Sequence, residues 1–287
     1  MINQTIPKSY LVLLLSKQVV KTMKVLESNG VTPPDAASLE RNFHIKYGST
    51  GELGWGPSTR KRYGYYNPDD YYETVIDDLL KEGQSWLDVG CGRRIFPSNP
   101  NLAELLAERS GYLAGVDPDN TIQENPFIDE GFQVLMDDFR SDRKFDLITM
   151  RMVAEHVVDP EKLMTAVCDC TRQGSYVIVY TINRWSPVPV VTHLAPFALH
   201  HPAKKVLWGS EQKDTFPTAY KMNTYKQLGK LFSRHGFDTA FFAYLDDCRT
   251  LARYKSLLNL ELILQKITSS VGIVYPENCL LGVYRKR

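Results

Sequence analysis

Two glycines and an acid lie close together in the segment Trp86-Leu-Asp-Val-Gly-Cys-Gly-Arg-Arg94. Gly90 and Gly92 have no Cβ, so the backbone there can approach a bound molecule closely. Asp88 precedes the first glycine, and its negative charge would repel a pyrophosphate but attract a cationic amino group. The segment therefore predicts a loop for a cofactor with a cationic amino-acid group and argues against a dinucleotide.

Further acids occur where later strands should end. Asp117 closes the next predicted strand, where a carboxylate can accept hydrogen bonds from ribose hydroxyls. Asp138 and Phe139 follow the third strand and suit an adenine, whose amino group the carboxylate would bind and on which the ring would stack. The spacing leaves Asp137 as the alternative to Asp138. Together these residues favour S-adenosylmethionine as the cofactor.

The pattern over Trp86–Ile182 resembles the class I S-adenosylmethionine-dependent methyltransferases. The resemblance implies that the glycine loop holds the methionine part of the cofactor and that the downstream acids hold its nucleoside. The segment FDLITMRMVAEHVVDPEKL resembles the family's fourth motif, whose first residues run under the cofactor, so Arg151 should lie near it. Many members have a third glycine where this chain has Arg94, and Arg93 or Arg94 could therefore contact an acidic group of the substrate.

Short apolar runs alternate with helical patterns from residue 85 onward, which predicts a parallel sheet with helices on both faces. The predicted strands are Ser85–Val89, Tyr112–Val116, Gln133–Met136, Phe145–Met150 and Tyr176–Ile182. The predicted helices are Asn101–Ser110, Pro160–Cys170 and Tyr225–His235. The resemblance implies seven strands, with Thr239–Tyr244 and Leu280–Arg285 as an antiparallel hairpin. We expect an α/β fold, a doubly wound and mostly parallel seven-stranded sheet.

Residues 1–72 are expected to form a helical cap before the core. Helical spacing and capping residues predict helices over Leu11–Leu26, Ala36–Tyr47 and Asp69–Lys81. Five glycines and one proline between Gly48 and Gly64 favour a loop. In the family that the chain resembles, an N-terminal segment commonly caps the cofactor, which implies a place near it for Tyr65 or Tyr66. Packing of a helix against the sheet is the alternative for these tyrosines.

Residues 183–224 form a long insertion within the expected core, residues 73–287. Such length predicts a lid or a binding element, and the aromatic residues, prolines and histidines suit the walls of an organic-substrate pocket. His200, His201 and Tyr220 are its candidate catalytic residues. Metal binding by these two histidines with His193 lacks a strong ligand spacing, so we expect no metal.

Methyl transfer to a hydroxyl requires an acceptor held in line and a group that removes its proton. His156 follows the fourth core strand, at the edge of the sheet where such an active site lies. An imidazole can accept a proton near neutral pH, so His156 is the first candidate base. A structural residue at the start of a helix is the alternative.

Composition limits the partners and the compartment. The chain has 34 Lys+Arg and 33 Asp+Glu, a formal net charge of +1, which gives no general reason to bind nucleic acid or an anionic membrane. Five cysteines without a CxxC pair favour a reducing compartment, and no early apolar run is long enough to cross a bilayer. We expect a cytoplasmic protein. The predicted helix Leu251–Ile267 is apolar on more than one face and leaves room for an interface, such as a homodimer.

The leading hypothesis is therefore a methyltransferase for a small organic acceptor. We expect O-methylation in a biosynthetic or glycan-related pathway, because KDTFPTAYKMNT resembles a segment of methyltransferases from bacterial glycan and natural-product pathways. Two alternatives stay open: a protein or nucleic-acid methyltransferase, and a non-catalytic subunit that binds S-adenosylmethionine.

Overall fold

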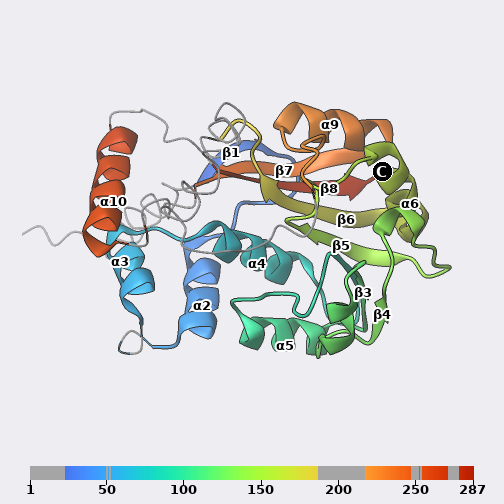
Figure 1. Cartoon of the computed structure of the whole chain (residues 1–287), viewed down its shortest axis with the longest axis horizontal. Helices are drawn as coiled ribbons and strands as arrows, with labels where there is room; N and C mark the ends of the chain where they lie inside the picture. Colours follow the sequence, from blue (N-terminus) through green and yellow to red (C-terminus); the bar gives the residue numbers. More distant parts are fainter. Residues whose placement is uncertain are drawn as a thin grey trace, which may run out of the picture.

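The computed structural model of the chain describes residues 23–49, 51, 53–186, 217–246, 252, 254–270 and 278–287. Within this part, one eight-stranded sheet has the order β1-β7-β8-β6-β5-β2-β3-β4 (Figure 1). Its strands are β1 (Met23–Ser28), β2 (Ser85–Val89), β3 (Tyr112–Val116), β4 (Glu130–Phe132), β5 (Phe145–Arg151), β6 (Thr171–Ile182), β7 (Phe237–Leu245) and β8 (Cys279–Lys286). The expected α/β class is confirmed.

Five neighbouring strands, β6, β5, β2, β3 and β4, run parallel, and three antiparallel strands complete the sheet. The parallel pairs are β4–β3, β3–β2, β2–β5 and β5–β6, whereas β6–β8, β8–β7 and β7–β1 pair antiparallel. The expected hairpin of the last two core strands is present as β7 and β8. Parallel pairing brings the carboxyl ends of β3, β2, β5 and β6 to one edge, where ligands bind in such sheets.

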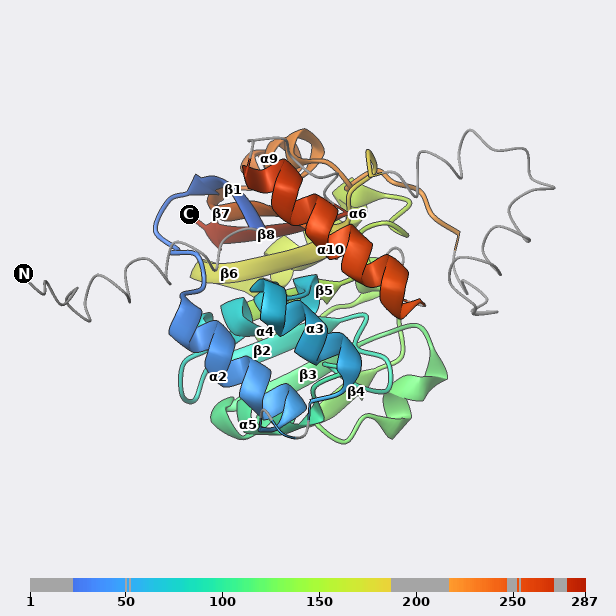
Figure 2. The same cartoon turned by 90° about the vertical axis from the view of Figure 1, so that its left-hand side faces the viewer.

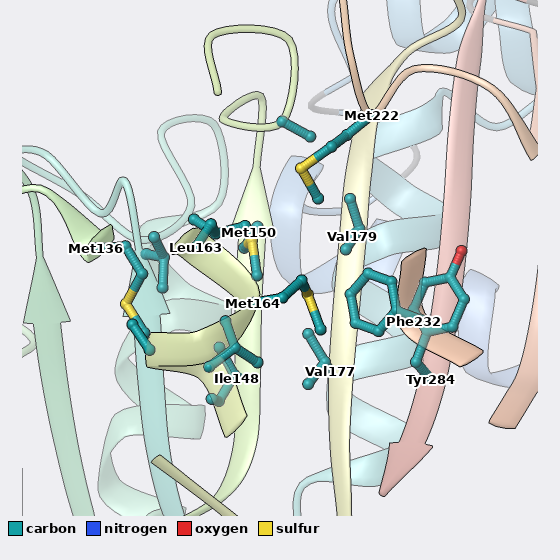
Figure 3. Packing of buried hydrophobic residues seen from close by; sticks show 14 of the residues in the cluster. Met136, Ile148, Met150, Leu163, Met164, Val177, Val179, Met222, Phe232 and Tyr284 are labelled. Carbon is teal, nitrogen blue, oxygen red and sulfur yellow. The ribbon is translucent and has the colours of Figure 1, made fainter. Parts of the chain in front are cut away.

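Two hydrophobic clusters fill the layers on either side of the sheet. One lies between the sheet and the helices α4 (Pro68–Leu79) and α5 (Pro100–Arg109). The other lies between the sheet and the helices α6 (Pro160–Cys170) and α9 (Tyr225–Arg234). Figure 3 shows the second cluster, in which Met164 and Phe232 pack on Val177 and Val179 of β6. Alternate residues of the central strands serve the two clusters, which explains why these strands read as continuous apolar runs.

Capping residues define where the helices begin. Asn67 and Asp70 form a capping box at α4, and Asn99 accepts a bond from the backbone N–H of Leu102 in α5. Asp159 accepts two backbone bonds at the start of α6. Pro68, Pro100 and Pro160 each open a helix, where a missing N–H costs nothing. These local signals explain the agreement with the predicted helices.

Three expectations about elements were wrong. Residues 23–28 form β1, which pairs with the edge of β7, and they are not the end of a helix; this strand raises the count from seven to eight. Gly48–Gly64 is not all loop, because it holds α3 (Trp55–Tyr63), with Gly54 and Gly64 as its caps. The short third core strand is Glu130–Phe132 instead of Gln133–Met136. Helix α2 (Ala36–Tyr47) has its predicted bounds, and α10 (Lys255–Ser270) begins and ends later than expected.

Candidate active site

The glycine loop after β2 adopts a backbone that only glycine accepts easily. Gly90 has φ +75°, and a Cβ at this position would overlap Cγ2 of Val153. Gly92 has φ +43°, and its N–H donates to Oδ2 of Asp117 over 2.9 Å. Asn125 donates to the carbonyl of Gly92 over 3.1 Å, a support that no sequence motif indicated. The loop is therefore fixed against β3 and against the segment that follows β5.

Asp117 keeps acceptor capacity after these contacts. One carboxylate oxygen accepts from the N–H of Gly92 and the other accepts from the N–H of Asp119 over 2.8 Å. Because each carboxylate oxygen can accept more than one bond, the group can still receive two ribose hydroxyls. The side chain lies at the carboxyl end of β3, as the sequence predicted.

Asp88 is buried beneath the loop and is held by a chain of hydrogen bonds. Trp86 Nε1 donates to Thr149 Oγ1 over 2.7 Å, and Thr149 Oγ1 donates to Asp88 Oδ1 over 2.6 Å. Burial raises the pKa of Asp88 to about 7, although the bond from Thr149 and the charge of Arg151 oppose the rise. A cation beside this carboxyl would favour its charged form. Sequence reasoning missed Thr149, which the register places opposite Asp88 on β5.

Helix α4 covers the carboxyl ends of β5 and β6. Arg151 Nη2 lies 2.9 Å from Oδ1 of Asp69 in the first turn of the helix, and the charge of Asp69 helps to raise the pKa of Arg151 although burial opposes it. The ring of Tyr72 stacks on Tyr180 with centroids 5.2 Å apart. The hydroxyl of Tyr72 is buried and finds no hydrogen-bond partner among the described residues. Sequence reasoning had not selected Tyr72.

The two residues predicted for the adenine differ in exposure. The side chain of Asp138 is 61% exposed, and its Oδ1 lies 2.7 Å from Lys162 Nζ. Phe139 is 2% exposed and packs edge to face on Phe132, with centroids 4.9 Å apart. The ring of Phe139 belongs to the core cluster, so in this structure it packs against a protein side chain. Asp137, the alternative acid, is partly buried, and burial raises its pKa.

The tyrosines of the cap lie in the helical layer. Tyr65 packs with Leu258 and Leu262 of α10. The hydroxyl of Tyr66 donates to Oε2 of Glu40 over 2.9 Å, and its ring meets Phe43 edge to face. Both tyrosines therefore make the contacts expected of residues that pack a helix in place. A position near the cofactor stays a prediction for them. The expected boundary after residue 72 falls within α4.

His156 lies in the segment after β5, next to the end of the insertion. Its Nδ1 is 3.2 Å from the carbonyl oxygen of Pro217. Just after Pro217, the backbone N–H groups of Ala219 and Tyr220 donate to the carbonyl oxygen of Glu155, over 2.7 and 3.1 Å. The structure thus brings His156, one predicted catalytic residue, next to a short strap, residues 217–224, that contains a second one, Tyr220.

Glu155 fixes this strap to the sheet. Asn223 Nδ2 donates to Thr181 Oγ1 over 2.8 Å, and Thr181 Oγ1 donates to Oε2 of Glu155 over 2.7 Å. All three residues are buried, and burial raises the pKa of Glu155. Met222 is fully buried and anchors the strap in the cluster of Figure 3. No spacing signal in the sequence links residues 155, 181 and 223, which meet only through the fold.

Backbone strain is concentrated beside the same strap. Met152 and Tyr220 are the non-glycine residues with positive φ in the described part of the chain, at 54° and 52°. Such conformations cost free energy and persist where neighbouring contacts hold them. At Tyr220 the holding contact is the bond to Glu155. Both strained residues of the described part of the chain therefore lie in the region where the acceptor is expected to bind.

Some predicted residues lie outside the described residues, namely His193, His200 and His201. Among the residues that are described, no group of three or more His, Cys, Asp or Glu side chains is arranged to hold a metal ion. In the same part of the chain no helix has the length and apolarity needed to cross a bilayer.

The chain belongs to the methyltransferase domain family, whose pattern matches residues 62–240. It thus carries the domain of the class I S-adenosylmethionine-dependent methyltransferases, with a Rossmann-like sheet. Curated relatives include the ubiquinone biosynthesis O-methyltransferase of Coxiella burnetii (strain Dugway 5J108-111), 22% identical over 160 residues. The same enzyme of Alkalilimnicola ehrlichii is 26% identical over 171 residues.

These matches cover only part of each protein. They span 53% and 54% of this chain and 66% of each relative's length. Among solved structures, geranyl diphosphate C-methyltransferase from Streptomyces coelicolor A3(2) is 13% identical, covers 91% of both chains and has a TM-score of 0.48. The fold assignment stands on the sheet topology described above.

The site residues fit the cofactor of this family. The buried carboxyl of Asp88 suits the cationic end of an amino-acid group, and the buried hydroxyl of Tyr72 can donate to its anionic end. Bound S-adenosylmethionine supplies a methyl group on a positively charged sulfur. Asp88, the glycine loop and Asp117 would hold its amino-acid and ribose parts.

Proposed function

We propose that this enzyme methylates an oxygen of a small organic acceptor, with His156 as the base. The observation that carries the proposal is the contact between Nδ1 of His156 and the carbonyl of Pro217. A carbonyl oxygen only accepts, so Nδ1 must carry the proton of this bond. In the neutral ring, the lone pair then lies on Nε2, which is the tautomer that a proton acceptor needs.

The chemistry follows from this tautomer. Bound S-adenosylmethionine would supply the methyl group to the acceptor oxygen, and its sulfur would keep the electron pair of the carbon–sulfur bond. The hydroxyl proton goes to Nε2 of His156. The charge on the resulting imidazolium acts on Glu155, the preceding residue in the chain, whose carboxyl is tied to the sheet through Thr181. Positioning and proton removal are the contributions that the protein must make.

Two relatives described above support oxygen as the acceptor atom, because they are O-methyltransferases of ubiquinone biosynthesis. The position of the strap supports a small acceptor. Its residues close over the carboxyl ends of β5 and β6 and leave His156 only partly buried. We therefore propose the insertion 183–224 as the acceptor-binding element, with His200, His201 and Tyr220 as further candidates for contact with the acceptor.

A matched pair of substitutions tests the base. His156→Asn places an amide donor where Nδ1 lies and can keep the bond to Pro217, whereas His156→Gln places an amide near Nε2. Neither accepts a proton, so both should slow turnover by about 100- to 10,000-fold if His156 is the base. Formation of S-adenosylhomocysteine is measured with small catechols and methyl glycosides, and with aryl amines of matched shape.

Near-normal turnover by His156→Asn would reduce His156 to a positioning residue, because only the bond to Pro217 would then matter. Turnover with the amines and none with the hydroxyl compounds would overturn O-methylation. Calorimetric titration with S-adenosylmethionine serves as the control. Both variants should bind the cofactor with wild-type affinity, since no cofactor contact is assigned to His156.

A further inference from the structure

A cluster of reactive side chains lies at the opposite edge of the sheet from the candidate active site. It consists of Glu161 and Cys168 of α6, His235 at the end of α9 and Lys286 at the end of β8. Cys168 comes shortly before Thr171, the first residue of β6, and so lies at the amino end of the parallel strands. Figure 1 shows α6 and the end of the chain far from α3 and α10, the helices nearest the viewer in Figure 2. The cluster therefore takes no part in the methyl-transfer site.

The imidazole of His235 connects two side chains of α6. Glu161 and Cys168 lie about two turns apart on the same face of this helix. Nε2 of His235 is 2.8 Å from Oε2 of Glu161, and Nδ1 is 4.0 Å from Sγ of Cys168. A nucleophile beside a base that a third group orients is the arrangement found in enzymes with an activated thiol.

The bond to Glu161 decides which nitrogen of His235 can act as a base. This bond lowers the pKa of Glu161, so the carboxylate is ionised near neutral pH and can only accept. Nε2 must then carry the proton of the bond. In the neutral ring the lone pair therefore lies on Nδ1, the nitrogen next to the thiol of Cys168.

The ammonium group of Lys286 lies next to the sulfur. Its Nζ donates to Sγ of Cys168 over 3.4 Å and to the carbonyl oxygen of His235 over 2.8 Å. The same carbonyl oxygen is 3.5 Å from Sγ, and Nζ lies 4.5 Å from the ring centre of Phe237. These contacts hold a positive charge where negative charge forms when the thiol gives up its proton.

The other described cysteines lack these features. Cys91, Cys170 and Cys279 are buried, whereas Cys168 is partly exposed. Burial raises the pKa of Cys170, on the same helix, to about 11. A reacting thiol needs both access and a group that removes its proton. In the described part of the chain, Cys168 is the cysteine that has both.

We propose that Cys168 is a modification site, at which the thiol exchanges with low-molecular-weight disulfides. Nδ1 of His235 takes the thiol proton, and the thiolate sulfur attacks one sulfur of the disulfide. A bond forms between Sγ and that sulfur, while the S–S bond of the disulfide breaks and its electron pair leaves with the second sulfur. The second sulfur takes the proton from His235 and departs as a thiol. One thiol and one disulfide thus give one mixed disulfide and one thiol, with no further oxidant.

The charge of Lys286 also selects among disulfides. It lies at the sulfur itself, so a disulfide with carboxylates is attracted to the reacting atom and a disulfide with ammonium groups is repelled. We therefore expect oxidised glutathione, which carries carboxylates, to react faster than cystamine, which carries two ammonium groups.

The test measures how fast the folded full-length chain forms a mixed disulfide with oxidised glutathione at pH 7, by mass spectrometry of the protein and its fragments. Cys168 should react at least about 10-fold faster than the same cysteine in the chain unfolded in urea. Cys168→Ser should remove this reaction. The matched control Cys170→Ser should keep it, because Cys170 is fully buried.

Substitutions of the two neighbours test the mechanism. His235→Gln should slow the reaction at least about 10-fold, because the amide takes no proton. Lys286→Met should slow it about threefold or more and remove the preference for oxidised glutathione over cystamine. Lys230→Met, which removes an exposed charge elsewhere on α9, is the control and should react as the wild type does. All variants should bind S-adenosylmethionine with wild-type affinity, which shows that they are folded.

Three outcomes would overturn the proposal. The first is a wild-type rate no higher than that of the unfolded chain. The second is an adduct on another cysteine in place of Cys168. The third is an unchanged rate in both His235→Gln and Lys286→Met, because the thiol would then react without the help of the cluster.

Discussion

The two halves of the site are built differently, although they share one edge of the sheet. On the side of β2 and β3, backbone N–H groups and buried side chains hold a loop in a conformation that glycine adopts without strain. On the side of β5 and β6, Met152 and Tyr220 occupy the left-handed region without being glycine. We propose accordingly that the glycine loop is a rigid cradle for the cofactor, and that the strap is a strained element for the acceptor, held separately by Glu155.

The largest expected effect comes from displacing the glycine loop at Gly90. Gly90→Ala should weaken S-adenosylmethionine binding at least about 100-fold and lower the melting temperature, because the new Cβ overlaps Val153 at a positive φ. Gly83→Ala is the matched control, since Gly83 has φ +73° with nothing within 4 Å of the added Cβ. It should destabilise the protein while leaving cofactor affinity unchanged.

Calorimetry and thermal unfolding distinguish the two glycines. Adding Val153→Ala to Gly90→Ala should recover part of the affinity, because it removes the overlapping methyl group. Equal loss of affinity in Gly83→Ala and Gly90→Ala would show that backbone strain, and not the overlap with Val153, explains the effect.

A smaller effect should follow from removing the Glu155 side chain, which holds the strap to the sheet through Thr181 and Asn223. Glu155→Ala leaves the Thr181 hydroxyl without its acceptor in a buried place, which costs about 1–3 kcal/mol and loosens the strap. We expect kcat to fall roughly 10- to 100-fold, while the dissociation constant of the cofactor changes less than about twofold. Glu155→Gln retains an oxygen for Thr181 and should keep most of the activity. A parallel loss of cofactor affinity would mean that the two halves are not independent.

The last expected effect is a dependence of cofactor affinity on pH, through Asp88 beneath the glycine loop. Because burial raises the pKa of Asp88 to about 7, the free enzyme carries a proton there below that pH. A cationic amino group binds the ionised form, so cofactor affinity should rise with pH up to about 7 and then level off. Below pH 7 the change should approach tenfold per pH unit. Asp88→Asn should bind weakly at every pH, and titrations in buffers of different ionisation enthalpy should show proton release in the wild type only.

Elements with local signals were predictable to the residue. Ser85–Val89, Tyr112–Val116 and Pro160–Cys170 have the predicted bounds because apolar runs and capping residues mark their ends. Helix α3 was missed since its glycines and proline read as loop formers. In the structure Gly54 and Gly64 are its caps and Pro57 lies in its first turn, where proline is tolerated.

The residues of the candidate site also divide into those that a local sequence pattern marks and those that meet only through the fold. Asp88, Gly90 and Asp117 follow strands in a recognisable pattern, so their shared edge could be predicted. Thr149 could have been found only with the register of β2 and β5 in hand. The chain of bonds from Asn223 through Thr181 to Glu155 joins residues far apart in sequence, and no local pattern marks it.

Strand β1 has a consequence for the order in which the protein is assembled. It pairs Met23 with Leu245, so the first described element of the chain completes the sheet against one of the last. During synthesis β1 therefore emerges long before its partner exists, and closing so large a loop is a slow step. The parallel core from β2 to β6 can form while β1 waits. The outer edge of β7 stays open until β1 returns, and this interval is when the growing chain is most exposed to pairing with a neighbour.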